Sequence, residues 1–172
     1  MKDDEGPKYP GVYRGRVLNN QDPLSKGRVT AQCPDVHGLL PTTWAMPCAP
    51  MTGLQSGVYI VPPLNAGVWI MFEEGDVNHP IWMGCWWDGR EEVPALAQAS
   101  VPPHHAIVLQ ASPPPRQLSL SIDNKTGILL TGPNGATISI SDVGITINNG
   151  KGATIDMVGK SVIINQGALV VT

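Results

Sequence analysis

Glycine recurs at near-regular intervals in the last third of the chain, and this repeat strongly limits what the chain can fold into. The glycines stand seven to nine residues apart, at Gly127, Gly135, Gly144, Gly152, Gly159 and Gly167. The third residue after each glycine is apolar, and these six residues are Leu130, Ile138, Ile147, Ile155, Val162 and Val170. Apolar and polar residues alternate between the glycines, so the pattern predicts short strands separated by tight corners.

A single copy of this repeat cannot bury its own apolar face, because no helix or second sheet is predicted in the rest of the chain. We expect three identical chains to wind around one axis, with the strands of each chain pairing with those of its neighbours. The six apolar residues would stack in the centre as a dry column, the trimer core. A single-chain β-solenoid, or one half of a β-sandwich, is the alternative.

Short strands are also predicted in the N-terminal half of the chain. Runs of alternating apolar residues at 11–18, 27–33 and 67–72 are separated by turns rich in glycine and proline. Five or six such strands in roughly 80 residues, with no helix signal, favour a small closed β-barrel. The nineteen glycines and seventeen prolines of the chain also favour an all-β protein with many turns.

The composition argues against several classes of function. The formal net charge is −3 and only 15% of the residues are charged, so the broad basic surface of a nucleic-acid-binding protein is missing. No stretch of about twenty residues is continuously apolar, and the polar N-terminus has no hydrophobic signal core. The cysteines Cys33, Cys48 and Cys85 have no paired spacing, which favours buried free thiols in a protein assembled in a reducing cytoplasm.

Five short segments of the N-terminal half stand in a characteristic order. They are Tyr13-Arg-Gly-Arg-Val-Leu-Asn-Asn-Gln-Asp-Pro23, Gly27-Arg-Val29, Trp44-Ala-Met-Pro47, residues 62–76 and Pro80-Ile-Trp-Met-Gly84. Together they resemble the OB-fold domain of the phage baseplate central spike family, which includes gp5-like and V-type baseplate proteins and the VgrG spikes of type VI secretion. The glycine repeat is similar to the trimeric β-helix that these spikes carry below the OB domain.

The residues and the resemblance together predict an all-β protein with four parts. These are an N-terminal arm at 1–8, an OB-fold domain at 9–90, a proline-rich linker at 91–105, and a neck with an intertwined trimeric β-helix (β-prism) rod at 106–172. The resemblance implies a structural, non-enzymatic central spike of a contractile injection machine. Such a spike would seat on a gp27-like hub protein and pierce the target cell envelope when the sheath contracts. It would be assembled in the bacterial cytoplasm and join a phage tail baseplate or an extracellular injection particle.

The end of the chain predicts a contact with a further protein. The rod would end in a small apolar platform formed by Ala168, Leu169, Val170 and Val171. Exposed apolar platforms mark binding surfaces, and in the resembling systems a PAAR-type tip protein covers such a blunt end. Fraying of the terminal strand is the alternative.

No catalytic residue, metal or cofactor is predicted. Some family members carry a lysozyme domain between barrel and rod, but here that interval holds only Asp88, Glu91 and Glu92, in linker context. Some related spikes end in a His-x-His metal site, and this chain has no histidine after residue 105. Adjacent His104 and His105 would hold a metal only by meeting their symmetry mates at an axis, and exposed linker histidines are the alternative.

The N-terminal half contains four tryptophans close together, Trp69, Trp82, Trp86 and Trp87. OB barrels often bind single-stranded nucleic acid by stacking bases on aromatic rings over a basic groove, which makes nucleic-acid binding an alternative function. Here the acidic turn at 73–76 and Asp88 lie nearby in the sequence and would repel phosphates. We therefore predict core packing or contacts with the rod or hub for these rings, and no nucleic-acid partner.

Overall fold

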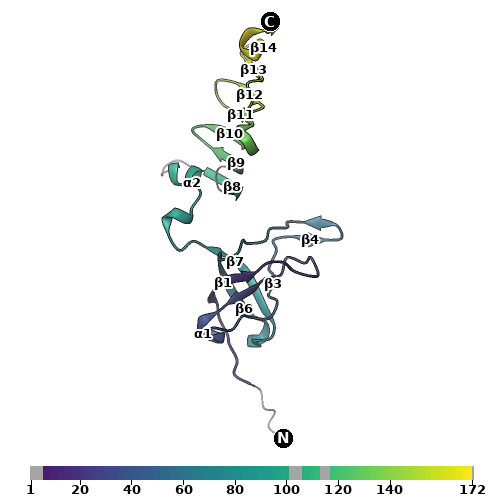
Figure 1. Ribbon diagram of the computed structural model, residues 1–172, viewed down its shortest axis with the longest axis vertical. Coiled ribbons are helices and arrows are strands. Elements are labelled where there is room, and N and C mark those ends of the chain that lie inside the picture. Colours follow the sequence, from purple (N-terminus) through teal and green to yellow (C-terminus); the bar gives the residue numbers. More distant parts are fainter. Residues whose placement is uncertain (1–5, 101–105, 113–116, 172) are drawn as a thin grey trace. The chain divides into compact units, whose positions relative to one another are not determined.

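The computed structural model describes residues 6–100, 106–112 and 117–171 of the chain. The chain divides into two compact units, residues 1–90 and 91–172. Over the described residues, the first unit contains a five-stranded sheet and a small hairpin, and the second contains an eight-stranded sheet (Figure 1). The secondary structure is thus mostly β, as predicted.

The sheet of the first unit has the strand order β2-β1-β6-β7-β3. Its strands are β1 (Tyr13–Asn19), β2 (Thr30–Gln32), β3 (Met46–Pro47), β6 (Gly67–Phe72) and β7 (Pro80–Trp86). β3 runs parallel to β7, and the other neighbours are antiparallel. Between β3 and β6 the chain forms a separate hairpin from β4 (Thr52–Gly53) and β5 (Ser56–Gly57).

Two isolated β-bridges close this sheet into a barrel. Val29, just before β2, pairs with Ala45, and Gln32 at the end of β2 pairs with Pro41. The segment 41–45 continues directly into β3, which pairs with β7. Hydrogen-bonded neighbours therefore follow one another around a complete ring, which is the small closed barrel that the sequence predicts.

Alternate residues of the barrel strands fill its interior. Val17, Val68 and Ile70 are fully buried, and the rest of this core consists of Val29, Ala31, Ala45, Phe72 and Trp82. Cys33 is also fully buried, and this burial raises the pKa of its thiol. Cys48 and Cys85 are free but exposed, so the prediction of buried thiols is correct for Cys33 only.

Short helical segments occur where the sequence indicated none. α1 (Pro34–His37) starts at a proline, whose fixed φ suits the first position of a helix. α2 (Ala95–Ala99) has the sequence Ala-Leu-Ala-Gln-Ala, with high helix propensity, and lies inside the predicted linker. The Ser100 hydroxyl donates a hydrogen bond to Asp123 Oδ2 (2.8 Å), so the end of α2 is attached to β9 within the second unit. Single 3-10 turns are present at η1 (Glu73–Gly75), η2 (Arg90–Glu92), η3 (Pro133–Gly135) and η4 (Asn165–Gly167).

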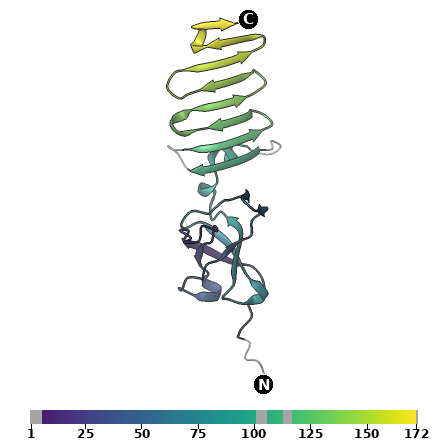
Figure 2. The same ribbon diagram turned by 90° about the vertical axis from the view of Figure 1, so that its right-hand side faces the viewer.

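The second unit is one antiparallel sheet whose strands follow one another as a meander (Figure 2). The strands are β8 (Ala106–Ser112), β9 (Leu118–Asp123), β10 (Gly127–Thr131), β11 (Thr137–Ile140), β12 (Ile145–Asn148), β13 (Thr154–Val158), β14 (Ser161–Ile164) and β15 (Leu169–Val171). Each strand pairs with the next one in the chain. The glycine repeat therefore folds into strands and corners, as its pattern predicts.

The pairing partners of these strands differ from the expectation. We expect strands of one chain to pair with those of neighbouring chains, whereas β8 to β15 pair with one another inside a single chain. Tight turns return the chain beside itself, and glycines let adjacent strand ends approach. At Gly127 (φ 88°), for example, a Cβ would collide with the carbonyl oxygen of Ile140 on the next strand. The ladder between successive strands is thus complete without a partner chain.

Candidate functional site

One face of the eight-stranded sheet carries two columns of apolar residues. Directly paired residues of antiparallel strands share a face, and so do residues two apart in one strand. The backbone pairing defines a first column of Leu109, Leu120, Leu130, Ile138, Ile147, Ile155, Ile164 and Leu169. The second column consists of Ile107, Ile122, Ile128, Ile140, Ile145, Met157, Val162 and the position of Val171. We call the surface formed by both columns the apolar face.

The apolar face is uncovered in a single chain. Ile147 in the middle of the sheet is 39% exposed, and Leu109 in β8 is 60% exposed. Ser121, on the opposite face, is only 7% exposed. This is the reverse of the usual arrangement, in which large apolar side chains are covered and serines face water. A continuous apolar surface of this kind marks an interaction site.

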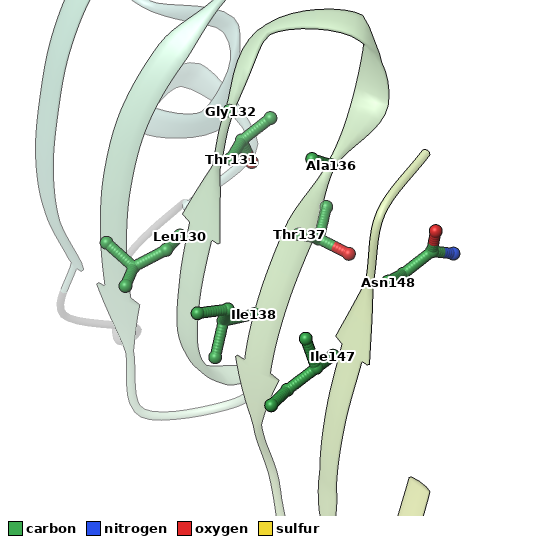
Figure 3. Close-up of a pocket in the computed structure, with 8 residues that line it drawn as sticks. All are labelled: Leu130, Thr131, Gly132, Ala136, Thr137, Ile138, Ile147 and Asn148. Carbon is green, nitrogen blue, oxygen red and sulfur yellow. The ribbon is translucent and has the colours of Figure 1, made fainter. Parts of the chain in front are cut away.

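A hollow lies next to the first column, near the turn between β10 and β11. Leu130, Ile138 and Ile147, from three neighbouring strands, line a hollow of about 400 Å³. Figure 3 shows these three side chains next to one another on β10, β11 and β12. No charged residue lines the hollow, so it suits apolar side chains from a second surface.

The opposite face of the sheet is mostly polar in its central strands. Its middle positions from β9 to β13 are Ser121, Leu129, Ser139, Thr146 and Asp156, whereas those in β8, β14 and β15 are the apolar positions Val108, Ile163 and Val170. The Thr146 hydroxyl donates a hydrogen bond to Asp156 Oδ1 across β12 and β13 (2.8 Å). The central strands therefore have one polar face and one apolar face.

The predicted trimer-core residues fall into three groups. Leu130, Ile138, Ile147 and Ile155 all belong to the first column, as their spacing after glycine predicts. Val162 lies on the same face but in the second column, since it pairs with Met157.

Val170 departs from the backbone register of the other five residues, and its place in the trimer core stays a prediction. Its backbone pairs with Ile163, in the alternate register, while Leu169 pairs with the first-column residue Ile164. The turn formed by η4 begins directly after Ile164, whereas Thr131 and Gly132 separate Leu130 from the corresponding turn at η3. The connection through η4 is therefore shorter, and the residue that pairs in the first column is the second after the glycine instead of the third.

The predicted tip residues lie at the last strand of the sheet. Ala168 follows η4 and is exposed, and Leu169 at the start of β15 is also exposed. The side chains of Val170 and Val171 lie outside the described part of the chain. Contact with a tip protein therefore stays a prediction.

The tryptophans occupy three different environments. Trp82 belongs to the barrel core, and its Nε1 donates a hydrogen bond to the carbonyl oxygen of Gly27 (3.1 Å), as predicted for core packing. Trp69 and Trp86 are half-buried and their ring centroids lie 6.3 Å apart. Trp87 is exposed.

Arginines, and not only acidic residues, surround the Trp69–Trp86 pair. The guanidinium of Arg14 lies 5.6 Å from the Trp69 ring centroid and 5.0 Å from that of Trp86, and Arg16 also lies 5.0 Å from the Trp86 centroid. The sequence neighbours of these tryptophans are acidic, but β1 brings arginines from far away in the sequence to β6 and β7.

The Trp86 ring is already occupied by contacts within the barrel. A Cβ at Gly67 would lie 2.6 Å from the ring, so the indole packs directly on the backbone of β6. Its Nε1 donates a hydrogen bond to the carbonyl oxygen of Val68 (3.2 Å). Together with the arginines over the ring, these contacts favour a structural role for Trp86 rather than base stacking.

The residues considered for chemistry do not form a centre in the described ranges. Within residues 6–100, 106–112 and 117–171, no three His, Cys, Asp or Glu side chains are grouped to hold a metal ion. His104 and His105 lie outside these ranges. Asp88 accepts a hydrogen bond from Arg16 Nη2 (2.6 Å) on the surface of the barrel. In the same described part of the chain, no helix has the length and apolar character that crossing a membrane requires.

A closed β-barrel followed by a sheet with one uncovered apolar face is the arrangement of a chain that associates through that face. Residues 13–87 match the family model of the type VI secretion system/phage-baseplate injector OB domain. Residues 103–170 match that of the phage baseplate V C-terminal trimerisation domain. No curated protein matches the chain. The two domains, in this order, place the chain in a baseplate spike family, whose members are structural parts of a virion or injection machine, and the second domain supports a homotrimer.

The spacing after glycine identifies one apolar residue per repeat, so it predicts the first column and not the second. A signal for the second column is present in the sequence, since Ile138 and Ile140, and then Ile145 and Ile147, are spaced two apart. Spacing of two places both members of a pair on one face of a strand. The alternation within the strands therefore predicts both columns.

Proposed function

We propose that three copies of this chain bury their apolar faces against one another and form the central spike of a contractile injection machine. The observation that carries this proposal is the uncovered apolar face, which extends over every strand from β8 to β15. A trimer explains it, because three such faces can turn towards one axis while their polar faces remain in water. The match to a trimerisation domain supports this number of copies.

The trimer would differ from the predicted intertwined rod in how it is held together. Each chain supplies a complete antiparallel sheet, and the faces of three sheets meet as a prism. Burying a Leu or Ile side chain is worth about 1.5–3 kcal/mol, and the column residues in one chain already bury part of their surface. Their remaining contribution is on the order of 1 kcal/mol each, repeated in both columns.

The proposed role is mechanical and non-catalytic. The interlocked columns would make the rod resist bending, since many side-chain contacts and ladder hydrogen bonds must break together. The OB barrels would seat the trimer on a hub protein, and the rod would transmit the thrust of sheath contraction to a small area of target envelope. A PAAR-type protein would cover the end at Ala168 and Leu169. These partners follow from the resemblance to baseplate spikes.

A substitution in the first column tests the proposal. Ile147→Asp would place three carboxylates near the axis of the trimer, where they cannot be paired or hydrated. We expect the variant to lose the trimeric mass in light scattering at concentrations at which the unmodified chain is trimeric. Particles assembled with this variant should also lack an ordered spike in electron microscopy.

The matched control is Ser139→Asp, in the adjacent strand on the polar face. This variant should keep the trimeric mass, because its carboxylate faces water. A trimer that tolerates Ile147→Asp as well as Ser139→Asp would show that the apolar face is not the contact surface.

A further inference from the structure

The hairpin of the first unit is an apolar arm that the barrel does not cover. We define the barrel arm as residues 48–61, which comprise β4, β5 and the extended segments on either side. Figure 1 shows this hairpin standing out from the barrel strands. Leu54 at its tip is 97% exposed, and Tyr59 and Ile60 on the returning segment are each 68% exposed. Met51 and Val58 are exposed as well.

The barrel arm lies in a long stretch without charge. No Asp, Glu, Lys, Arg or His occurs between Gly38 and Phe72, although 15% of the whole chain is Asp, Glu, Lys or Arg. Exposed loops normally carry charged residues that keep them in water and discourage association. An arm that combines apolar side chains with complete absence of charge is suited to burial against another apolar surface.

Specific contacts hold the base of the barrel arm. A Cβ at Gly27 would lie 3.3 Å from Tyr59 Cε2, so the tyrosine ring packs on the backbone of this glycine. Asn20 Nδ2 donates a hydrogen bond to the carbonyl oxygen of Pro62, just after the arm (3.0 Å). The arm is therefore presented by the barrel in a defined direction.

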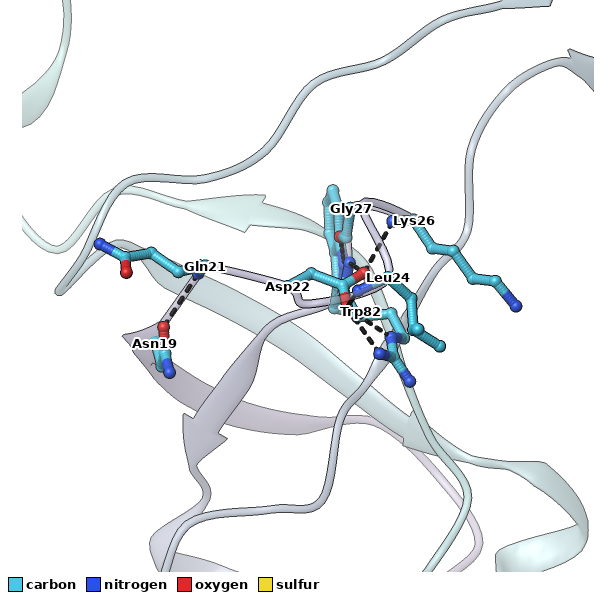
Figure 4. A network of polar contacts seen from close by, with 8 residues as sticks. Asn19, Gln21, Asp22, Leu24, Lys26, Gly27 and Trp82 are labelled. Carbon is cyan, nitrogen blue, oxygen red and sulfur yellow. Dashed lines mark hydrogen bonds and ion pairs between the residues drawn. The ribbon is translucent and has the colours of Figure 1, made fainter. Parts of the chain in front are cut away.

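The loop beneath the arm is itself fixed. Asp22 accepts hydrogen bonds from the backbone N–H groups of Leu24 (2.9 Å) and Lys26 (2.7 Å) and pairs with Arg28 (Figure 4). The carbonyl oxygen of Gly27 accepts the hydrogen bond from Trp82 in the barrel core. A pre-ordered arm loses little conformational entropy when it binds, which favours a role as a docking element.

We infer that the barrel arm packs on the barrel of a second copy of this chain. The inference rests on the homotrimer of the proposed function, in which joined C-terminal units hold three barrels close together. Tethering of this kind gives effective concentrations on the order of millimolar, so the barrels of the other two copies are available to the arm without a separate partner. The lack of charge in the arm agrees with packing on another copy of the chain. A separate partner with a charged surface would be recognised through opposite charges, and the arm has none.

Cross-linking from the tip of the arm tests this inference on the full chain. A photoreactive phenylalanine derivative is placed at Leu54, and the purified protein is irradiated and separated under denaturing conditions. We expect bands at two and three times the chain mass, with the cross-linked peptides mapping to residues of the first unit of another copy. The control position is Leu39, in the loop after α1, which is 89% exposed and should give no such bands.

The native mass of the same sample separates the two proposals. A trimeric mass with cross-links confined to one chain, or with equal yields from Leu54 and Leu39, overturns the arm contact and leaves the apolar-face trimer standing. A monomeric mass overturns both. Cross-links from Leu54 to a different protein in assembled particles, without bands between copies, would assign the arm to that partner and also overturn the inference.

Discussion

At the scale of single residues, Asp22 organises the loop between β1 and β2. The pKa of Asp22 lies well below its ordinary value of 3.8, although burial acts in the opposite direction. The main cause is the guanidinium of Arg28, whose Nη2 lies 2.6 Å from Asp22 Oδ1. Hydrogen bonds from the backbone amides of Leu24, Lys26 and Arg28 lower the pKa further. The folded chain thus binds this proton less readily than the unfolded chain. The contribution to stability is present above pH 3.8 and is lost as the pH falls below it towards the pKa of the folded state.

Asp22→Asn should remove this pH-dependent contribution. We expect the variant barrel to unfold at lower urea concentration than the unmodified barrel at about pH 7. The difference should begin to shrink towards about pH 3, because Asp22 then binds a proton in the unfolded chain while it stays ionised in the folded chain. Asp35→Asn, an exposed acidic residue in α1, serves as the control and should change the midpoint little. A difference between Asp22→Asn and the unmodified chain that stays constant over this pH range would contradict the assignment.

At the scale of elements, the sequence predicts which segments are strands better than it predicts their partners. Alternation around Ile138 and Ile147 is sufficient to identify strands and their apolar side. It says nothing about whether the next strand belongs to the same chain, because a ladder has the same side-chain pattern in both cases. The connections decide this, because tight turns return the chain beside the strand that it has just formed.

The spacing after glycine also does not predict the register at the end of the sheet. It places Val170, the third residue after Gly167, in the first column. The connection through η4 is shorter than the one through η3, however, and Leu169 pairs with Ile164 instead. In the barrel, β3 is only two residues long and joins the ring through isolated bridges, so no periodicity identifies it. α1 and α2 are too short to show a helical period in the sequence. The contacts of Arg14 with Trp69 and Trp86 depend on which strands are neighbours in the sheet, and the sequence pattern does not give that order.

A pair of substitutions in β14 checks the register directly. Ile164→Ala removes a first-column side chain and should cost roughly 2–5 kcal/mol per chain if that side chain is buried in the trimer. Ile163→Ala, one residue earlier, changes the opposite face and should cost clearly less. The midpoint of guanidinium unfolding at fixed protein concentration measures both. A larger effect from Ile163→Ala would show that the faces are reversed.

At the scale of the whole molecule, the chain combines a barrel closed by long-range pairing with a sheet built from consecutive hairpins. In the barrel, β1 lies between β2 and β6, so strands distant in the sequence must meet. In the sheet, every strand of the described chain contacts its immediate predecessor and successor. Removing two adjacent strands from the sheet should therefore leave the rest intact, provided that the register is kept.

A deletion of residues 132–148 meets this condition. The deletion joins β10 to the turn before β13. Thr131 then takes the place of Asn148 opposite Thr154, and Leu130 takes the place of Ile147 opposite Ile155. We expect a folded trimer whose sheet is shorter by roughly 10 Å, measured as maximum dimension in solution scattering, since neighbouring strands lie about 4.8 Å apart. Deleting residues 132–147 instead shifts the register by one residue and should abolish the trimer. Equal behaviour of the two deletions would contradict the two-column arrangement.

The meander allows the length of the eight-stranded sheet to change by whole hairpins. Because each hairpin carries its own share of both columns, duplication of one hairpin within the gene would lengthen the sheet by a fixed step without any change to the barrel. Variation in length among such proteins should then occur in multiples of two strands, each adding roughly 10 Å. Evolution can in this way change the length of the sheet while the sequence of the barrel stays the same.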